Sequence, residues 1–280
     1  MQTVNTVPEL REVIRSWRSA GESVALVPTM GNLHAGHLQL VNEAKKKADR
    51  VVVSIFVNPT QFGAGEDFET YPRTEREDRE KLDAANTDLL FLPAVADVYA
   101  PDAKTVVTVA ELSDLYCGAS RPGHFSGVAT VVCKLFNSVQ PNVALFGLKD
   151  FQQLVVIRTM VRDLNIPVEI IGVDTVREPN GLAMSSRNGY LTDAEKRVAP
   201  KLYHSLCTAR DLILTGTQAF AAIEQQALQF LQRAGFQPDY FSVCRSSDLK
   251  KASAEDVDLV LLAAVKLGKT RLIDNIYFSR

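Results

Sequence analysis

Short apolar runs rich in β-branched residues alternate with longer amphipathic stretches up to about residue 176, and this alternation constrains the fold more than any other feature. Such runs are typical of buried strands, and the amphipathic stretches between them are typical of helices. The pattern predicts a parallel sheet with helices on both faces, which binds its ligands at the carboxyl ends of the strands. The expected strands are 23–29, 51–57, 88–93, 143–147 and 168–173, and the expected helices are 35–48, 74–85, 125–139 and 151–164.

The pattern changes after about residue 176. Thr192 and Glu195 have the spacing of a capping box, which predicts a helix from there to about residue 214. A second helix over 217–234 and strand-like segments at 239–244, 258–265 and 270–278 follow. We therefore predict an α/β protein with a Rossmann-like, doubly wound parallel sheet domain over residues 1–176. A smaller α+β domain is expected over residues 177–280.

Composition excludes several classes of protein. Lys and Arg number 31 against 33 Asp and Glu, so the net charge of −2 gives no overall attraction to nucleic acid or to an anionic membrane. The four cysteines form neither a CxxC pair nor a zinc pattern, and no apolar run is long enough to cross a bilayer. The N-terminal stretch is amphipathic and carries acidic residues, unlike a secretory signal. We expect a cytoplasmic protein with reduced thiols and with neither a nucleic acid nor a membrane as partner.

The stretch PTMGNLHAGHLQL, residues 28–40, joins the first long strand to a helix. Gly31 and Gly36 allow a tight turn, and a helix beginning near Ala35 offers free N–H groups to an anion. His34 and His37 lie at the start of that helix, where an imidazole can donate a hydrogen bond to phosphate or add charge when protonated. The spacing alone leaves three interpretations open: a phosphate site, two structural histidines, or part of a metal site.

Polar residues also follow other predicted strands. FVNPTQF (56–62) and FGLKDFQQL (146–154) lie at strand ends, AMSSRNGYL (183–191) lies near the domain boundary, and RPGHFSGV (121–128) precedes a helix. Taken singly, most of these stretches are more typical of a turn, a surface ion pair or an ordinary loop than of a binding site. Together they indicate a site for phosphate and a polar organic substrate. There is no Walker loop, no GxGxxG and no GxSxG. The absence of a nucleophile elbow and of a Cys/His signature argues against covalent catalysis.

These motifs, with YPRT and TRLIDN, occur in the order and spacing of one family. The chain resembles the pantoate–β-alanine ligase family along its whole length, and PTMGNLHAGHL resembles the HxGH signature of nucleotidyltransferases. The resemblance implies a two-step reaction. The carboxylate of pantoate attacks the α-phosphorus of ATP to give pantoyl-adenylate and pyrophosphate. The amine of β-alanine then attacks the acyl carbon to give pantothenate and AMP.

The resemblance also implies roles for individual residues, each carried over by its motif. The implied catalytic residues are His34, His37, Lys149 and Arg187. The implied ATP contacts are Met30, Gly36, His37, Gly147, Lys149, Asp150, Val176, Met184, Ser185, Ser186 and Arg187. The implied pantoate contacts are Gln61, Gln153 and Asn58. Mg²⁺ is expected to bridge the phosphates with Asp78 as a contact, and a homodimer whose smaller domain closes over ATP is implied.

Two positions depart from the family pattern. Leu148 precedes the Lys-Asp pair where an acidic or amide residue is common, and Ala35 occupies a position that is often acidic. The sequence assigns no role to His124. Three alternatives compete with this function: a simple nucleotidyltransferase, which would not consume β-alanine; a non-catalytic nucleotide sensor; and a metal hydrolase, for which the sequence lacks a clustered third ligand.

Overall fold

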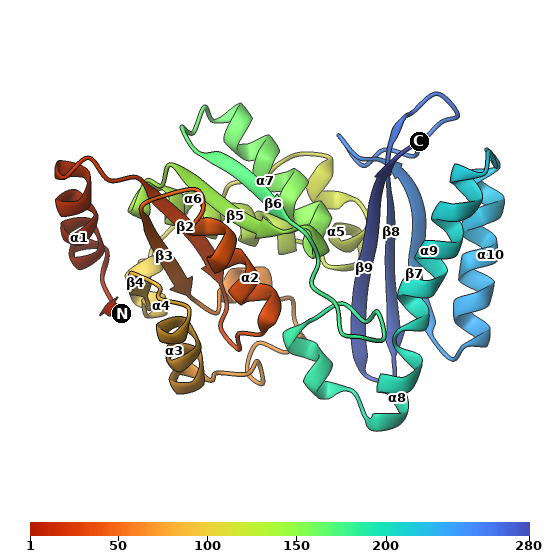
Figure 1. The fold of residues 1–280 in the computed structure, drawn as a ribbon, viewed down its shortest axis with the longest axis horizontal. Coiled ribbons are helices and arrows are strands. Elements are labelled where there is room, and N and C mark those ends of the chain that lie inside the picture. Colours follow the sequence, from red (N-terminus) through yellow and green to blue (C-terminus); the bar gives the residue numbers. More distant parts are fainter.

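A computed structural model describes residues 1–280, and its larger sheet has six parallel strands in the order β1-β4-β3-β2-β5-β6 (Figure 1). This confirms the predicted fold class. Strand β1, which the sequence analysis missed, pairs with β4 at one edge. The strands are β1 (Gln2–Val4), β2 (Val24–Thr29), β3 (Arg50–Ile55), β4 (Leu89–Phe91), β5 (Val143–Gly147) and β6 (Glu169–Val173).

Strands β2 and β5 are neighbours at the centre of the sheet. From β2 the chain adds strands towards one edge of the sheet, and from β5 it adds a strand towards the other edge. In one direction lie β3, β4 and β1, and in the other lies β6. This reversal is a topological switch point, where the connections that follow the two strands diverge to opposite faces and leave a crevice for ligands. The stretches that follow β2, β3 and β5 are the polar motifs of the sequence.

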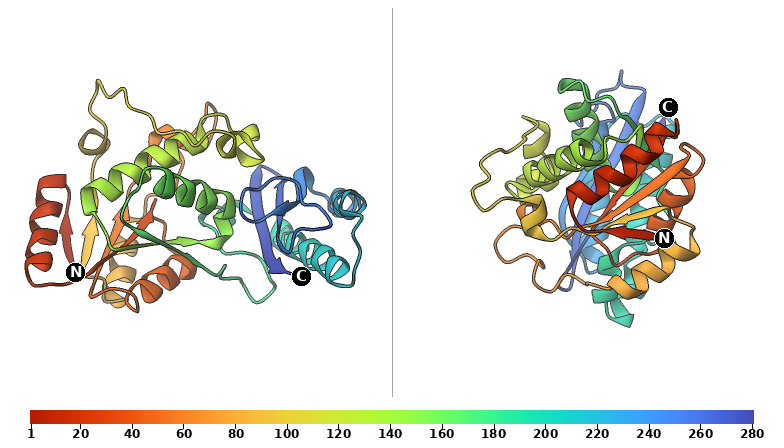
Figure 2. Two further views of the ribbon diagram at one scale, coloured as in Figure 1. Left: turned by 90° about the horizontal axis from the view of Figure 1, so that it is seen from above. Right: turned by 90° about the vertical axis from the view of Figure 1, so that its left-hand side faces the viewer.

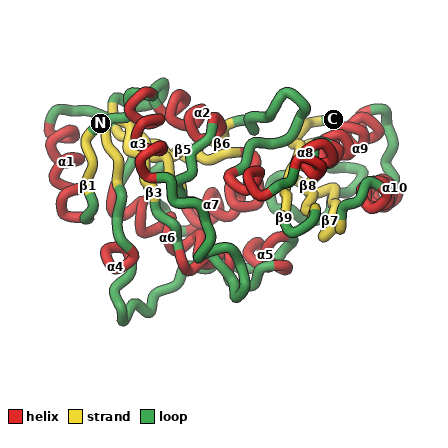
Figure 3. Tube along the Cα trace, turned by 90° about the horizontal axis from the view of Figure 1, so that it is seen from below, coloured by secondary structure: helices red, strands yellow, loops and turns green.

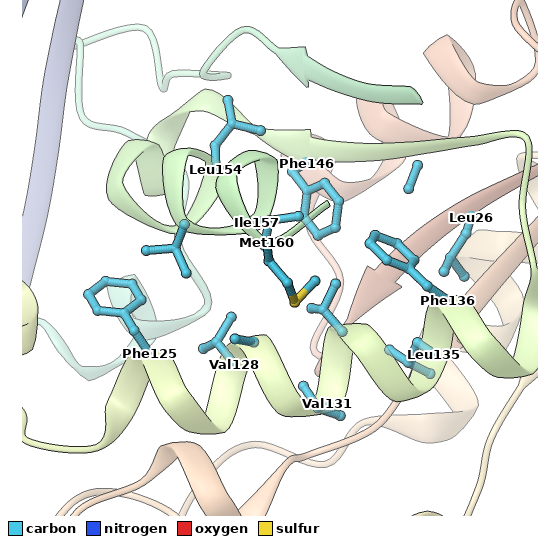
Figure 4. Packing of buried hydrophobic residues seen from close by; sticks show 14 of the residues in the cluster. Leu26, Phe125, Val128, Val131, Leu135, Phe136, Phe146, Leu154, Ile157 and Met160 are labelled. Carbon is cyan, nitrogen blue, oxygen red and sulfur yellow. The ribbon is translucent and has the colours of Figure 1, made fainter. Parts of the chain in front are cut away.

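Helices cover both faces of this sheet because side chains along each strand alternate between them (Figure 2). Leu26 and Phe146 point to one face, where they pack with α1 (Val7–Ser19), α6 (His124–Val139) and α7 (Phe151–Asp163), as Figure 4 shows for α6 and α7. Val27 and Leu145 point to the other face, which is covered by α2 (Ala35–Ala44) and α3 (Glu75–Ala84).

The C-terminal part is a three-stranded antiparallel sheet of β7 (Gln237–Arg245), β8 (Asp258–Leu267) and β9 (Thr270–Ser279). Helices α9 (Lys201–Leu214) and α10 (Phe220–Arg233) pack on its outer face (Figures 1 and 3). Along β8, Leu259 and Leu261 belong to this outer core. Val260 and Leu262 belong instead to the core around α6 and α7, so the two sheets share an apolar interface.

Two expected helices have different bounds. The helix expected from about Thr192 to residue 214 is two helices, α8 (Asp193–Val198) and α9, with a break at Pro200. Proline has no N–H to donate to the carbonyl four residues earlier, and its ring clashes with that carbonyl. The helix expected over 35–48 ends at Ala44, and the lysines after it form a turn.

The proposed domain boundary at 176/177 lies in the irregular segment 174–185, which connects β6 to the second part of the chain. None of the helices combines the length and the apolar character that a membrane crossing requires. The remaining short helical elements are η1 (Pro59–Gln61), α4 (Val95–Val98), η2 (Leu112–Asp114), α5 (Cys117–Ser120), η3 (Leu148–Asp150) and η4 (Ser186–Tyr190).

Candidate active site

His34 and His37 form a pair at the N-terminus of α2, next to the switch point. His34 is the N-cap, and its Nδ1 accepts the N–H of Gly36 at 3.1 Å. The Nδ1 of His37 accepts the N–H of His34 at 3.3 Å, and the ring centroids are 4.1 Å apart. A nitrogen that accepts a backbone hydrogen bond carries no proton. The pattern therefore assigns the proton of each neutral imidazole to Nε2, which is left free to donate to a ligand.

The surroundings of the pair favour this neutral form. Burial, with the nearby Lys149 ammonium acting in the same direction, lowers the pKa of His34 to about 4. Burial, with the neighbours His34 and Lys149 acting in the same direction, lowers the pKa of His37 to about 3. Both imidazoles are thus hydrogen-bond donors and not cations at neutral pH. Positive charge at this site comes from Lys149 instead.

Asp78 holds the turn before α2. Its Oδ2 accepts the N–H of Asn32 at 2.8 Å and its Oδ1 accepts the N–H of Leu33 at 2.7 Å. Thr74 donates a third hydrogen bond, and the Asp78 side chain is fully buried. Because both carboxylate oxygens are engaged in this way, the geometry does not support the expected Mg²⁺ contact. No group of three or more His, Cys, Asp or Glu side chains in the chain is arranged to hold a metal ion.

Asn58 and Gln61 lie on the turn η1, which follows β3. The Nδ2 of Asn58 donates to Gln61 Oε1 at 3.0 Å and to the carbonyl of Gly127 at 3.1 Å. Its Oδ1 accepts hydrogen bonds from Thr60 and from Tyr99. Asn58 is buried with every polar atom in use, so it positions Gln61 and has no free donor for pantoate. Gln61 presents its Nε2, which lies 3.2 Å from the sulfur of Met30.

His124, which had no assigned role, supports the backbone of Gln61. Its Nδ1 lies 2.8 Å from the Gln61 carbonyl, and its Nε2 lies 3.0 Å from the guanidinium of Arg121. Arg121 can only donate, so Nε2 accepts and Nδ1 carries the hydrogen that Gln61 receives. Arg121 in turn pairs with Glu66 at 2.5 Å. Burial, with the Arg121 charge, lowers the pKa of His124 to about 4 and keeps it neutral.

Lys149 lies on η3, between the carboxyl end of β5 at Gly147 and the start of α7. Its ammonium is mostly buried, with 19% of the side chain exposed, and its one ion pair is with Asp150 at 3.7 Å. Gln153 follows in the first turn of α7, where it is partly exposed. The effect of Lys149 on both histidines places its charge beside them. Two predicted groups, from β2 and from β5, therefore meet at the switch point.

The Ser-Ser-Arg stretch reaches this site from the far side. Ser186 donates to the carbonyl of Asn32 at 3.1 Å, in the turn before His34. Ser185 accepts the N–H of Arg187 at 3.2 Å and caps η4. The guanidinium of Arg187 forms two hydrogen bonds to the carboxylate of Asp67, at 3.0 and 2.8 Å. The guanidinium that was expected to bind phosphate is therefore paired with Asp67, a residue that the sequence analysis did not single out.

Two predicted nucleoside contacts, Val176 and Met184, lie in the irregular segment between the two sheets. The Val176 carbonyl accepts the N–H of Met184 at 3.0 Å, which ties together the two ends of the segment between the sheets. A Cβ at Gly36 would lie 4.0 Å from the Val176 side chain and 2.9 Å from the His34 ring. A larger residue than glycine would therefore push His34 aside.

The matching family model covers residues 2–277 and describes pantoate–β-alanine ligase. The chain belongs to the pantoate–β-alanine ligase family. It is 56% identical to the pantothenate synthetase of Shewanella loihica, with all of both chains aligned. It is 57% identical to that of Methylococcus capsulatus, aligned over all of this chain and 98% of the relative.

Solved structures of the pantoate–β-alanine ligase family have the same fold. A pantothenate synthetase of Thermus thermophilus superposes with a TM-score of 0.94 at 46% identity, and the alignment covers 99% of each chain. A pantoate–β-alanine ligase of Francisella tularensis, in complex with β-γ ATP and β-alanine, superposes with a TM-score of 0.81 at 33% identity. That alignment covers 99% of this chain and 97% of the Francisella chain.

Proposed function

We propose that this protein condenses pantoate with β-alanine at the expense of ATP, through a pantoyl-adenylate, and releases AMP and pyrophosphate. The observation that carries the proposal is the family membership over residues 2–277, with pantothenate synthetases 56% and 57% identical over full length. The arrangement of the site supports it independently: two neutral imidazoles, the partly exposed Lys149 ammonium and two glutamines follow the carboxyl ends of β2, β3 and β5.

In the first step, a carboxylate oxygen of pantoate forms a bond to the α-phosphorus of ATP. The bond from that phosphorus to the bridging oxygen breaks, and pyrophosphate leaves with the electron pair. Negative charge on the phosphates shifts during this exchange, so donors held in place before the reaction stabilise the transition state. We assign this role to the Nε2–H groups of His34 and His37, to the Lys149 ammonium and to the N-terminus of α2.

Pantoate is assigned to the two glutamines. Asn58 holds Gln61 through its Oε1, and Nε2 donates one hydrogen to the Met30 sulfur and has a second for the carboxylate. Gln153 lies on α7 near Lys149. A neutral amide can orient a carboxylate without neutralising it, whereas a guanidinium would stabilise its charge and lower its nucleophilicity. The substrate supplies the nucleophile, so positioning is the main task of the protein in this step.

The triphosphate is assigned to Ser185, Ser186 and Arg187 on the side of the second sheet. The Arg187 guanidinium can form two hydrogen bonds to the triphosphate only after its ion pair with Asp67 is broken. The nucleoside is assigned to Met30, Gly36, Asp150, Val176 and Met184. Closure of the C-terminal part over ATP would keep water away from the adenylate.

Mg²⁺ is proposed to enter with ATP and to be held by phosphate oxygens, because the chain offers no clustered ligands of its own. When bound, it would neutralise phosphate charge. On the family resemblance we also propose a homodimer, and on the four free cysteines a cytoplasmic location.

The test is pantoate-dependent exchange of labelled pyrophosphate into ATP without β-alanine, followed by AMP release when β-alanine is added. Exchange without the amine, and AMP only with it, is expected. A simple nucleotidyltransferase would not consume β-alanine. A nucleotide sensor would bind ATP without exchange, and bound zinc in the purified protein would indicate a metal hydrolase.

A further inference from the structure

The motif TRLIDN lies on β9, in the C-terminal sheet, and its asparagine reaches the turn that carries Lys149. The Nδ2 of Asn275 donates to the carbonyl of Leu148 at 2.9 Å and to the carbonyl of Lys149 at 2.8 Å. An amide nitrogen has two hydrogens, so these bonds use both. The Asn275 side chain is buried, with 6% of the residue exposed. A residue more than a hundred positions away in sequence thus holds the peptide groups on both sides of the Lys149 Cα.

Asn275 is itself held in place from the preceding residue. The Oδ1 of Asp274 accepts the backbone N–H of Asn275 at 2.8 Å. The same buried carboxylate accepts two hydrogen bonds from Arg177, at 2.7 and 2.9 Å. Arg177 belongs to the segment between the two sheets, and its guanidinium lies 3.5 Å from the ring centroid of Tyr203 on α9. The β9 backbone at Asn275 is therefore fixed by charged and aromatic contacts from two other elements.

Apart from the packing of the Leu148 side chain against the core, the turn has few other restraints of its own. The N-cap positions of η3 and α7, Gly147 and Asp150, make no side-chain capping hydrogen bond. The only ion pair of Lys149 is a long contact with its neighbour Asp150. The hydrogen bonds from the Asn275 side chain therefore supply a restraint that the local sequence does not, and they act on the residue assigned to stabilise the phosphates.

We infer that Asn275 is a positioning residue for Lys149, fixing its turn from the second sheet so that the ammonium meets the phosphates. The inference rests on the proposed function and deepens it. Displacing a catalytic group by about 1 Å can lower a rate by about 100-fold. Loss of Asn275 is expected to slow adenylation without removing any group that touches a substrate.

A double-mutant cycle tests this. In the full-length protein, Asn275→Ala is expected to lower the rate of pantoate-dependent pyrophosphate exchange about 10- to 100-fold at saturating substrates. In the Lys149→Ala background the same change is expected to cost less than about 3-fold, because the group it positions is already gone. Thr270→Val is the matched control, since Thr270 is equally buried on β9 and has no hydrogen bond to the turn. It should leave exchange unchanged.

Equal losses in both backgrounds, or no loss from Asn275→Ala, would overturn the inference while wild-type exchange kept the proposed function intact. If Asn275→Ala does not fold, Asn275→Ser takes its place in the same cycle. If Lys149→Ala or the wild type shows no exchange, amine labelling of Lys149, followed by mass spectrometry, replaces the kinetics. Labelling of Lys149 relative to Lys81 should then rise severalfold without Asn275, and an unchanged ratio would overturn the inference.

Discussion

At the residue scale, the neutral state of His34 and His37 makes stability depend on pH. Their pKa values in the folded protein, about 4 and about 3, lie below the ordinary value of 6.5. Between pH 6.5 and pH 4 these histidines bind more protons in the unfolded chain than in the folded protein. The free energy of unfolding should therefore fall as the pH falls through this range. Each histidine contributes at most about 1.4 kcal/mol per pH unit. Urea unfolding between pH 4.5 and 7.5 measures the slope.

The variant His37→Gln tests the origin of that slope. Glutamine does not titrate, so the variant should lose less stability than the wild type over the same pH interval. Comparison at pH 7.5 gives the change that is independent of protonation. Parallel curves for the two proteins would show that His37 is not protonated on unfolding in this range and would contradict the assignment.

Gln61 gives a second prediction at this scale. In Gln61→Arg, a guanidinium would face the carboxylate of pantoate, bind it well and damp its nucleophilicity. The rate of adenylation should therefore fall by about tenfold or more, while pantoate affinity changes less. Pyrophosphate exchange gives the rate, and calorimetric titration gives the affinity. Gln225→Arg adds the same charge on the exposed face of α10 and should change neither. Unchanged adenylation with intact binding would refute the idea.

At the element scale, the loop between η1 and α3 restrains the site through two acidic side chains. Glu66 pairs with Arg121 of the first part of the chain, and Asp67 pairs with Arg187 in η4. The pair between Asp67 and Arg187 should affect ATP binding, because Arg187 is the proposed triphosphate ligand. Its guanidinium is held in a bidentate pair that ATP must replace.

The variant Asp67→Asn should therefore bind ATP more tightly, by about fivefold, since a competing ion pair worth about 1 kcal/mol is removed. Calorimetric titration with ATP alone measures the change. Asp211→Asn breaks an exposed pair with Arg210 on α9 and is the matched control. Weaker ATP binding by Asp67→Asn would indicate that Asp67 orients Arg187 for the phosphates and does not compete with them.

The helices and strands also show which features could be predicted from the sequence and which could not. Local periodicity predicted strands β2 to β6 and helices α2, α3, α6 and α7, whereas helix α1 was not among the expected elements. Strand β1 is three residues long, too short to show a period, and is defined by its pairing with β4. The break at Pro200 was predictable from proline chemistry, but the capping box before it and the apolar pattern after it suggested one helix.

Some residues of the candidate site could likewise be predicted from the sequence, and others could not. The motifs after β2, β3 and β5 could be placed together from sequence because the carboxyl ends of parallel strands meet at one edge. Asp67, Asn58 and Asn275 act through contacts that depend on folding: Asp67 and Asn275 come from distant loops or strands, and Asn58 is held by Gly127 and Tyr99. No local pattern marks an amide as a positioning group and not a ligand. The resemblance named Asn58 as a pantoate contact, and only the full set of its hydrogen bonds suggests otherwise.

At the scale of the whole molecule, the two sheets are coupled more closely than a division at residue 176 suggests. Alternate side chains of β8 enter two different cores, the buried pair of Arg177 and Asp274 joins the connecting segment to β9, and Asn275 bonds to η3. Breaking a buried ion pair by removing one partner costs about 3–5 kcal/mol. Separating the two parts would expose apolar surface and also leave these polar groups unpaired.

We therefore expect the protein to unfold in one cooperative transition. Trp17, the only tryptophan, lies on α1 and reports on the larger sheet, whereas far-UV circular dichroism also follows α9 and α10. Urea curves from the two signals should coincide in midpoint and slope, because neither part keeps its core when the other unfolds. In Asp274→Ala the circular dichroism curve should separate from the fluorescence curve, since the coupling is weakened. Separate transitions in the wild type would instead show two domains that fold independently, with β8 contributing little to the core it shares with α6 and α7.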